Sequence, residues 1–276
     1  MEAFEAEVRQ YVAKHKPVLY MLTPCYGSLC YVSFMVCLVN TMNLCNSFGI
    51  EFHLEFCRND SLVPRARNNL IARAMSNPKA THFMFVDADI TWSALDVVKL
   101  LISHQYLVGG LYPLKHFHFE RLKDPNAIET WKAKRNSQPF LENISDEDII
   151  QHNLLRYNFN HVAGTNNTVQ IVKNLLEVRH LATGFMMIRR ETIETMQKAF
   201  PSTKYVDDVG FLKGNENEHA FALFDCGVEE EHYFSEDWLF SQRWKNLGGK
   251  IYVNVTINLT HTGIQDFTGS FLTSLL

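Results

Sequence analysis

Two carboxylates follow an apolar stretch in the first third of the chain. Asp87 and Asp89 stand one residue apart, directly after residues 83–86. Burying unpaired carboxylates is costly, so a strand that ends in two acids indicates a partner for their charge. Mg²⁺ and Mn²⁺ take oxygen ligands and keep positions open for phosphate oxygens. The pair therefore predicts a divalent cation site, and an acidic turn before the helix expected at Ser93 is the alternative.

Two arginines precede this stretch. Arg65 and Arg67 stand in the first turn of a helix that Pro64 is expected to open. Basic residues oppose the helix dipole there, which indicates a functional reason for their position. Guanidinium groups beside a helix N-terminus suit a pyrophosphate or the edge of a nucleobase, and Asn68 can bond a nucleotide or a neighbouring loop. A solvated basic turn is the alternative.

Further candidates stand near the C-terminus. Glu236 and Asp237 follow Ser235 at the expected start of a helix, where a carboxylate can cap the helix or act as a general base. His261 stands in a polar turn after the last expected strand, where it is either a surface residue or a metal ligand.

The elements that must position these side chains alternate between strand and helix. Apolar runs bounded by turn residues predict strands at 18–23, 51–57, 82–86 and 106–111, and helices at 31–48, 64–75 and 93–103. Such alternation predicts an α/β fold with a mainly parallel sheet and helices on both of its faces. Ligands of these sheets lie at the carboxyl ends of the strands, where Asp87 and Asp89 stand.

The second half is less regular. Residues 116–176 are polar, lack a strong period and are interpreted as an inserted region. Strands are expected at 179–188 and 250–259, and helices at 191–199 and 237–247. We expect one domain over 1–276, in which 17–115 and 177–276 form two halves of one site and 116–176 is the insertion.

Composition narrows the classes of protein. The chain has 276 residues, 46% of them hydrophobic and 20% charged, which excludes a disordered or fibrous protein. The net charge of −4 disfavours a nucleic-acid partner, including DNA as an acceptor. No apolar run approaches the roughly 20 residues of a membrane span. Six cysteines without a zinc-binding spacing favour reduced core residues and a cytoplasmic location.

The motifs together resemble the GT-A superfamily of nucleotide-sugar glycosyltransferases. They occur in that superfamily's order and cover most of the chain outside 116–176. The matching segments are Arg65-Ala66-Arg67-Asn68, residues 81–90 around Asp87-Ala88-Asp89, Val108-Gly109-Gly110-Leu111-Tyr112-Pro113-Leu114-Lys115, Ala182-Thr183-Gly184-Phe185-Met186 with Arg189-Arg190, Ser235-Glu236-Asp237, Gly248-Gly249-Lys250 and His261-Thr262-Gly263. Each segment alone is unspecific, and the ordered set does not identify a sugar.

The resemblance implies a single GT-A-like, Rossmann-like domain, in which 17–115 is the nucleotide-sugar-binding half and 177–276 is the acceptor-side half that completes the site. The implied activity is the metal-dependent transfer of a sugar from a UDP- or GDP-linked donor to a hydroxyl acceptor, a glycan or another hydroxyl-bearing molecule. Mn²⁺ or Mg²⁺ would be held by Asp87, Asp89 and His261, with Asp89 as the more direct carboxylate ligand.

The resemblance also implies roles for other residues. The donor would contact Thr23, Tyr26, Arg65, Arg67, Asn68, Asp87 and Gly184, with Tyr26 available to stack on the base. Asp237, or else Glu236, would face the acceptor as the general base of an inverting enzyme. The pairing of Arg-Asn with Asp-Ala-Asp also looks like retaining mannosyltransferases, so the stereochemistry stays open.

Two other functions remain alternatives. A sugar-nucleotide pyrophosphorylase has a similar fold, but the glycine-rich first loop of that family is absent from residues 23–27. A nucleotide-sugar-binding protein without turnover would have no need of Asp87, Asp89, Asp237 and His261 together. Processive enzymes of the superfamily carry Gln-x-x-Arg-Trp, whereas this chain has Gln242-Arg243-Trp244, so polymer synthesis is not supported.

Overall fold

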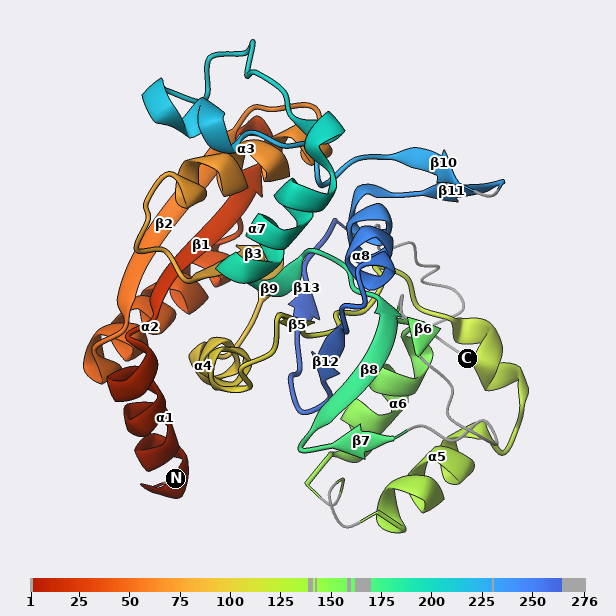
Figure 1. The fold of residues 1–276 in the computed structure, drawn as a ribbon. Coiled ribbons are helices and arrows are strands. Elements are labelled where there is room, and N and C mark those ends of the chain that lie inside the picture. The colour runs from red at the N-terminus through yellow and green to blue at the C-terminus, as the bar shows by residue number, and fades with distance from the viewer. Residues whose placement is uncertain are drawn as a thin grey trace.

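The chain forms a central β-sheet with helices on both of its faces (Figure 1). The computed structural model describes residues 2–138, 141, 143–157, 160, 161, 170–229 and 231–264. The α-helices are α1 (Glu2–His15), α2 (Val32–Phe48), α3 (Val63–Met75), α4 (Ala94–Ile102), α5 (Ala127–Asn136), α6 (Asp146–Leu154), α7 (Arg190–Ala199) and α8 (Glu236–Asn246). The strands of the central sheet are β1 (Val18–Cys25), β2 (Glu51–Arg58), β3 (His82–Val86), β5 (Leu107–Gly109), β6 (Asn160–His161), β7 (Ile171–Val172), β8 (Leu175–His180), β9 (Phe185–Arg189) and β12 (Tyr252–Asn254).

The central sheet is mixed. Its order is β2-β1-β3-β9-β5-β12-β8-β6, and β7 also pairs with β8. β1 runs parallel to β2 and β3, and β5 runs parallel to β12. β9 is antiparallel to β3 and β5, and β8 is antiparallel to β12, β6 and β7. Only β8 and β9 therefore run against the other strands of this sheet, which confirms an α/β fold whose strands are mostly parallel.

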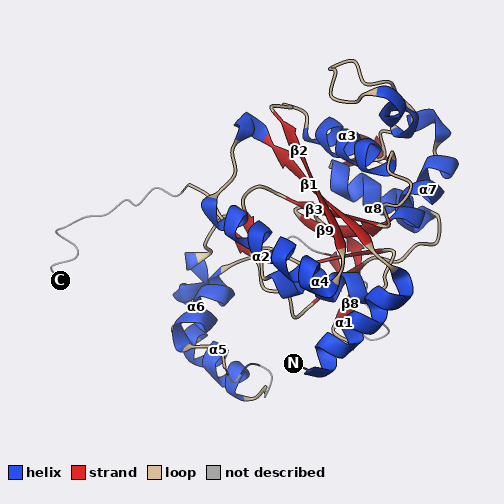
Figure 2. Cartoon of the chain, turned by 90° about the vertical axis from the view of Figure 1, so that its left-hand side faces the viewer, coloured by secondary structure: helices blue, strands red, loops and turns tan. Residues whose placement is uncertain are grey.

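Side-chain alternation divides the core into two layers. Along β3, Phe83 and Phe85 contribute to one buried cluster and Met84 and Val86 to the other, as the two-residue period of a strand requires. The first cluster contains side chains of α3, α7 and α8, and the second contains side chains of α1, α2 and α4. Figure 2 shows α2 and α4 on one side of the sheet and α3, α7 and α8 on the other.

Most boundaries in the first half match the expectations from sequence. α2 ends at Gly49, whose φ of 73° is the left-handed conformation that favours glycine at a helix C-terminus. α3 has its proline in the first turn. Ser93 caps α4 in a capping box with Asp96. Each of these helices carries its own local start or stop signal.

Two strand predictions were wrong. Residues 179–188 form the end of β8 and all of β9 except its last residue, separated by 181–184, because the two strands pair with different neighbours. Residues 250–259 form only β12, since the chain turns after Asn254. Its side-chain Oδ1 accepts hydrogen bonds from the backbone nitrogen and the hydroxyl of Thr256, which closes that turn.

Two small sheets complete the fold. β4 (Ile90–Thr91) pairs with β13 (Thr260–His261), and β10 (Gly227–Glu229) forms a hairpin with β11 (His232–Phe234). The inserted region contains α5 and α6, which the sequence pattern did not indicate. In the described part of the chain, no helix combines the length and the apolar character that a membrane crossing requires.

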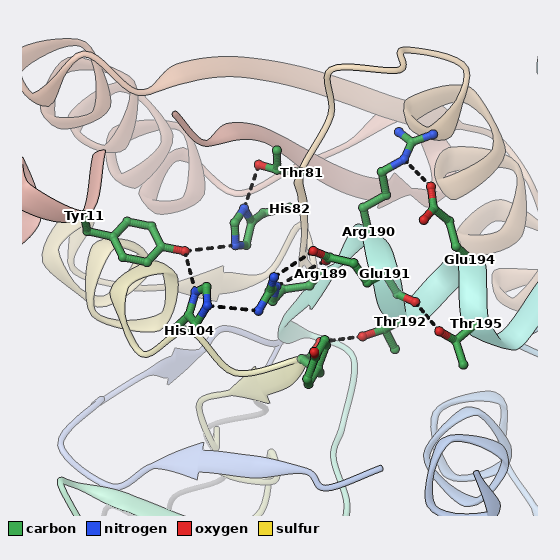
Figure 3. A network of polar contacts seen from close by, with 11 residues as sticks. Tyr11, Thr81, His82, His104, Arg189, Arg190, Glu191, Thr192, Glu194 and Thr195 are labelled. Carbon is green, nitrogen blue, oxygen red and sulfur yellow. Dashed lines mark hydrogen bonds and ion pairs between the residues drawn. The ribbon is translucent and has the colours of Figure 1, made fainter. Parts of the chain in front are cut away.

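Helix α1 was also not predicted. Its buried side chains are Val8 and Tyr11. The Tyr11 hydroxyl lies 3.5 Å from Nε2 of His82 and 3.3 Å from Nδ1 of His104 (Figure 3). His82 is the first residue of β3. This network therefore lies at the amino end of that strand, away from Asp87 and Asp89.

Candidate functional site

The turn that carries the two acids is held from three sides. The backbone nitrogen of Asp87 donates to the carbonyl of Gly184, which precedes β9. The nitrogen of Tyr31, before α2, donates to the carbonyl of Ala88, and that of Thr262, after β13, donates to the carbonyl of Asp89. Segments far apart in sequence thus fix residues 87–89 at the carboxyl end of β3.

Asp87 faces a buried guanidinium. Alternation along β3 directs Asp87 toward the layer of α3 and α8, where Arg67 lies 4% exposed. Nη1 of Arg67 is 3.1 Å from Oδ1 of Asp87, and Nε is 3.4 Å from Oε1 of Glu236. The guanidinium also lies over the ring of Phe85. Arg67 therefore joins carboxylates from β3 and α8 in one charged cluster.

Asp89 belongs to a second charged cluster beside the first. Nζ of Lys115 lies 2.6 Å from Oδ2 of Asp89, and Nε2 of His261 lies 3.5 Å from the same oxygen. Hydrogen bonds and charge from His261 and Lys115 outweigh partial burial and lower the pKa of Asp89. The carboxylate is thus held ionised between two nitrogen groups.

The orientation of His261 is set by the backbone. Its Nδ1 lies 2.8 Å from the carbonyl oxygen of Pro113, which can only accept, so Nδ1 carries the proton. With Nδ1 protonated, the cationic ring donates from Nε2 to Asp89, whereas the neutral ring carries on Nε2 a lone pair that can bind a cation placed between it and Asp89. A backbone carbonyl that fixes the tautomer in this way is typical of histidines that bind a metal ion.

The two acids at the start of α8 differ in their surroundings. The Asp237 side chain accepts hydrogen bonds from the hydroxyl of Ser235 and the nitrogen of Trp238, so it is engaged at the helix start. Burial, together with the charge of Asp237, raises the pKa of Glu236 despite the opposing effect of Arg67. Glu236 therefore binds a proton more readily than an ordinary glutamate does.

Gly184 approaches an aromatic ring closely. A Cβ at this position would lie 2.7 Å from Cζ and Oη of Tyr112. The Tyr112 ring also packs edge-on against His261, with 5.0 Å between centroids. Burial raises the pKa of Tyr112, so the phenol keeps its proton at neutral pH. The backbone at Gly184 is thus close to Tyr112, a residue that the sequence analysis did not single out.

The remaining predicted residues lie around these clusters. Arg65 binds Asp60 in a bidentate ion pair, with N–O distances of 2.9 and 2.8 Å. The Asn68 amide exchanges two hydrogen bonds with the backbone of Phe224, so it links α3 to the segment before β10. Thr23 is buried near the end of β1, and Tyr26 is 78% exposed in the following turn. Neither Arg65 nor Asn68 hydrogen-bonds to the clusters of Asp87 and Asp89 among the described residues.

Lys115 was missed as a functional candidate, although it ends the Gly-Gly-Leu-Tyr-Pro-Leu-Lys segment. A basic residue after a strand is common on any surface, and only the folded chain shows that its ammonium reaches Asp89. The signal was its position after β5, whose carboxyl end lies at the same edge of the sheet as that of β3.

Some buried polar atoms near the clusters have no partner. Among the described residues, Nη1 of Arg67, Oγ1 of Thr23 and Oγ1 of Thr183 are buried without a hydrogen bond. Nη1 of Arg67 is close to Asp87 but not aligned with it as a hydrogen-bond donor. Buried polar groups are usually satisfied, so these atoms have bonding capacity that a bound water, or a ligand atom admitted by a small shift of the side chains, would use.

The chain's fit to a divalent cation can be judged from the donor set. Asp89 and the Nε2 lone pair of His261 are suitable ligands. Asp87 is paired with Arg67, and the ammonium of Lys115 occupies the position beside Asp89 that a cation would take. In the described ranges, no three His, Cys, Asp or Glu side chains gather as a ready-made metal site. Asp89 and His261 therefore fit a cation provided that Lys115 moves aside.

Comparisons with known proteins give little more. No family model matches the chain, and no curated protein matches its sequence. Among solved structures, a crystal structure of A197 from STIV aligns over 90% of this chain and 86% of that chain. The identity is 12% and the TM-score is 0.45, so no assignment to a family follows.

Proposed function

We propose that this chain is a glycosyltransferase that moves a sugar from a nucleoside-diphosphate sugar to a hydroxyl acceptor. The observation that carries the proposal is the convergence of charged groups at the carboxyl end of β3. Arg67 and Glu236 meet Asp87 there, and Lys115 and His261 meet Asp89. Carboxylates beside fixed cations, at the edge where α/β sheets bind ligands, suit a diphosphate leaving group.

Arg67 supports the binding of the donor. A nucleoside diphosphate is negatively charged, and its charge increases as the glycosidic bond breaks. Nη1 of Arg67 lies 3.1 Å from Asp87 without an aligned hydrogen bond, so it is a donor that a phosphate oxygen can satisfy. A guanidinium forms strong, directional bonds with phosphate. Thr23 and Tyr26 at the end of β1 would contact the nucleoside, Tyr26 by stacking on the base.

A Mn²⁺ or Mg²⁺ ion would be held by Asp89 and His261. When bound, it would supply a Lewis acid that neutralises the leaving diphosphate. The chain's own contribution is the carboxylate of Asp89, kept ionised by its neighbours, and the ring of His261, kept in the metal-binding tautomer by Pro113.

Glu236 is our candidate for the general base, with Asp237 second. A base must accept a proton from the acceptor hydroxyl, and a raised pKa brings a carboxylate closer to that task. Asp237 already accepts hydrogen bonds from Ser235 and Trp238. This reverses the order expected from sequence, and a base at Glu236 would give inversion at the anomeric carbon.

The test is a panel of UDP- and GDP-sugars with Mn²⁺ and no acceptor. Slow hydrolysis of one donor, measured as release of UDP or GDP, is the expected result. Asp89→Asn should reduce the release at least tenfold, because the residue lies at the centre of the second charged cluster. Asp146→Asn is the matched control, since Asp146 is an exposed carboxylate paired with Lys132 and Arg135.

The panel also separates the alternatives. Nucleotide binding without turnover would favour a binding protein, and formation of nucleoside triphosphate from a donor and pyrophosphate would favour a pyrophosphorylase. If no donor is turned over and no donor binds, the proposal is wrong.

A further inference from the structure

A cavity of about 790 Å³ lies directly beside the Asp89 cluster. Lys115 and His261 both line it, and it extends between the chain after β5, the end of α6 and the segment that follows β12. Its volume is within the range of about 300–1,000 Å³ that is common for small-molecule sites. Of the metal and nucleotide contacts proposed above, only His261 lines this space.

The walls of the cavity are mostly apolar. Side chains that contribute apolar surface include Leu114, Phe117, Leu155, Leu176, Ile257 and Leu259. Ile257 and Leu259 are also buried members of the core cluster on the α2 and α4 side of the sheet. A bare sugar offers hydroxyls over most of its surface, so walls of this kind favour a ligand with an apolar body.

Backbone contacts hold the wall formed by the inserted region together and against the chain after β5. The nitrogen of Leu114 donates to the carbonyl of Arg156, and the nitrogen of His118 donates to the carbonyl of Leu154, both at 2.8 Å. Pro113 also pairs with Tyr157 in an isolated β-bridge. The cavity is therefore preformed by backbone contacts, which reduces the entropic cost of binding.

The charges of the lining select among ligands. No Asp or Glu is among the residues that line the cavity within the described part of the chain. Its ionisable side chains are Lys115, His116, His152, His261 and Tyr157. Burial raises the pKa of Tyr157, which keeps the phenol as a neutral donor. The nearest carboxylate, Asp89, is already paired with Lys115 and His261, so a cationic ligand would lack a free counter-ion, whereas a neutral or anionic ligand would meet hydrogen-bond donors.

We infer that this cavity binds the acceptor, and that the acceptor is an amphipathic alcohol with an aryl or alkyl body and no positive charge. Its body would lie against Leu155 and Ile257. Its hydroxyl would leave the cavity at the end where Lys115 and His261 meet Asp89, directed toward the neighbouring cluster of Asp87, Arg67 and Glu236 that holds the proposed base. The assignment of the ligand as an acceptor rests on the proposed function, while the binding preference rests on the cavity alone.

The experiment compares three naphthalene probes of one size by calorimetry: neutral 2-naphthol, anionic 2-naphthoate and cationic 2-naphthylmethylammonium. The first two should bind at least tenfold more tightly than the cation. Leu155→Glu places a carboxylate in the wall, so it should weaken binding of 2-naphthoate at least tenfold and strengthen binding of the cation. Leu122→Glu is the matched control, because Leu122 is 39% exposed in the short 3₁₀ helix Phe119–Lys123 and does not line the cavity.

A reversed preference in Leu155→Glu cannot arise from misfolding, which would weaken all three probes alike. Equal binding of the three probes, no binding, or no effect of Leu155→Glu would overturn the inference. With a donor that the panel above identifies, 2-naphthol should yield a naphthyl glycoside by mass spectrometry. Donor hydrolysis without probe binding would support the proposed function and contradict the assignment of this cavity to the acceptor. Probe binding with the predicted charge preference, without hydrolysis of any donor, would support the ligand preference of the cavity and count against the proposed transferase activity.

Discussion

Nε2 of His261 lies 3.5 Å from Oδ2 of Asp89 because the short ribbon of β4 and β13 joins the turn after β3 to a segment of the C-terminal half. His261 in β13 pairs with Ile90 in β4, the residue after Asp89. The nitrogen of Thr262 donates to the carbonyl of Asp89, which extends the same contact. The distance is thus a consequence of backbone register, and Lys115 reaches the same carboxylate from a third segment.

Replacing Lys115 by methionine should tighten binding of Mn²⁺. The ammonium, 2.6 Å from Oδ2 of Asp89, competes with a cation for that carboxylate and repels it. We expect at least a fivefold lower dissociation constant in Lys115→Met, measured by electron paramagnetic resonance of free Mn²⁺ without nucleotide. Lys99→Met is the matched control, since Lys99 pairs with Asp96 at 2.8 Å on α4. Unchanged affinity in both variants would show that Lys115 does not compete with a metal ion at Asp89.

Replacing Arg67 by methionine should destabilise the fold. Asp87 and Glu236 would lose the guanidinium that offsets their charge. Removing one partner of a buried ion pair costs about 3–5 kcal/mol, and the lower end applies because the Asp87 side chain is 29% exposed. Urea unfolding at pH 7.5 measures this loss.

A second substitution tests the cause. Glu236→Gln removes one of the two uncompensated acids, so the double variant Arg67→Met/Glu236→Gln should regain at least about 1 kcal/mol relative to Arg67→Met. Because the pKa of Glu236 is raised in the folded protein, its ionised form costs stability at neutral pH, and the single Glu236→Gln variant should not be destabilised. Additive losses in the double variant would contradict the coupling.

The first half of the fold is predictable because its elements carry local signals. Pro64 places the start of α3, Gly49 ends α2 in the left-handed conformation, and Ser93 caps α4. Asp87 and Asp89 are predicted at the end of a buried strand, and the structure places them there. Local signals of this kind act within one turn of the backbone, and they require no knowledge of the rest of the chain.

The contacts of the site depend on packing that no local pattern encodes. The pattern around Arg67 does not reveal that Glu236 shares its guanidinium, because α3 and α8 meet only across the core. Residues 179–188 read as one strand, yet they cross between two positions of the sheet. The order of strands β3-β9-β5 brings Lys115 to Asp89, and that order follows from how the two halves of the chain interleave.

Gly184→Ala should destabilise the protein through Tyr112. An added Cβ would lie 2.7 Å from Cζ and Oη of the Tyr112 ring, well inside van der Waals contact. Overpacking of this kind typically costs about 1–3 kcal/mol. Gly227→Ala is the matched control, because its nearest neighbour would be 3.7 Å away, in ordinary contact with Leu239.

Unfolding free energies are measured for Gly184→Ala, for Gly227→Ala, and for Gly184→Ala in a Tyr112→Ala background, to test whether Tyr112 causes the loss. In the Tyr112→Ala background, Gly184→Ala should cost almost nothing, since the atoms that the methyl group meets are gone. A loss of the same size in both backgrounds would mean that glycine is required for another reason.

Stability should fall as the pH drops below about 6.5, because the network in Figure 3 requires a neutral His82. Oγ1 of Thr81 donates its proton to the carbonyl of Val18, so it accepts from Nδ1 of His82, and Nε2 accepts from the Tyr11 hydroxyl. A proton on Nε2 would face that hydroxyl in a buried site near the charges of Arg189, His104 and His15 and the carboxylate of Glu191.

Burial lowers the pKa of His82 to about 3, against 6.5 for an unperturbed histidine. As the pH falls, the unfolded chain binds a proton at His82 before the folded protein does. The free energy of unfolding should therefore be constant above pH 6.5 with respect to this residue and decrease by roughly 1.4 kcal/mol per pH unit well below it, down to about pH 3. Urea unfolding at several pH values between 7.5 and 4.5 gives the slope.

The variant His82→Asn tests the cause. It keeps a donor for Thr81 but does not titrate, so the slope of its unfolding free energy against pH should be smaller by about one proton. His232→Asn, at an exposed position of β11, is the control and should keep the wild-type slope. Equal slopes in wild type and His82→Asn would show that another group controls the loss of stability in acid.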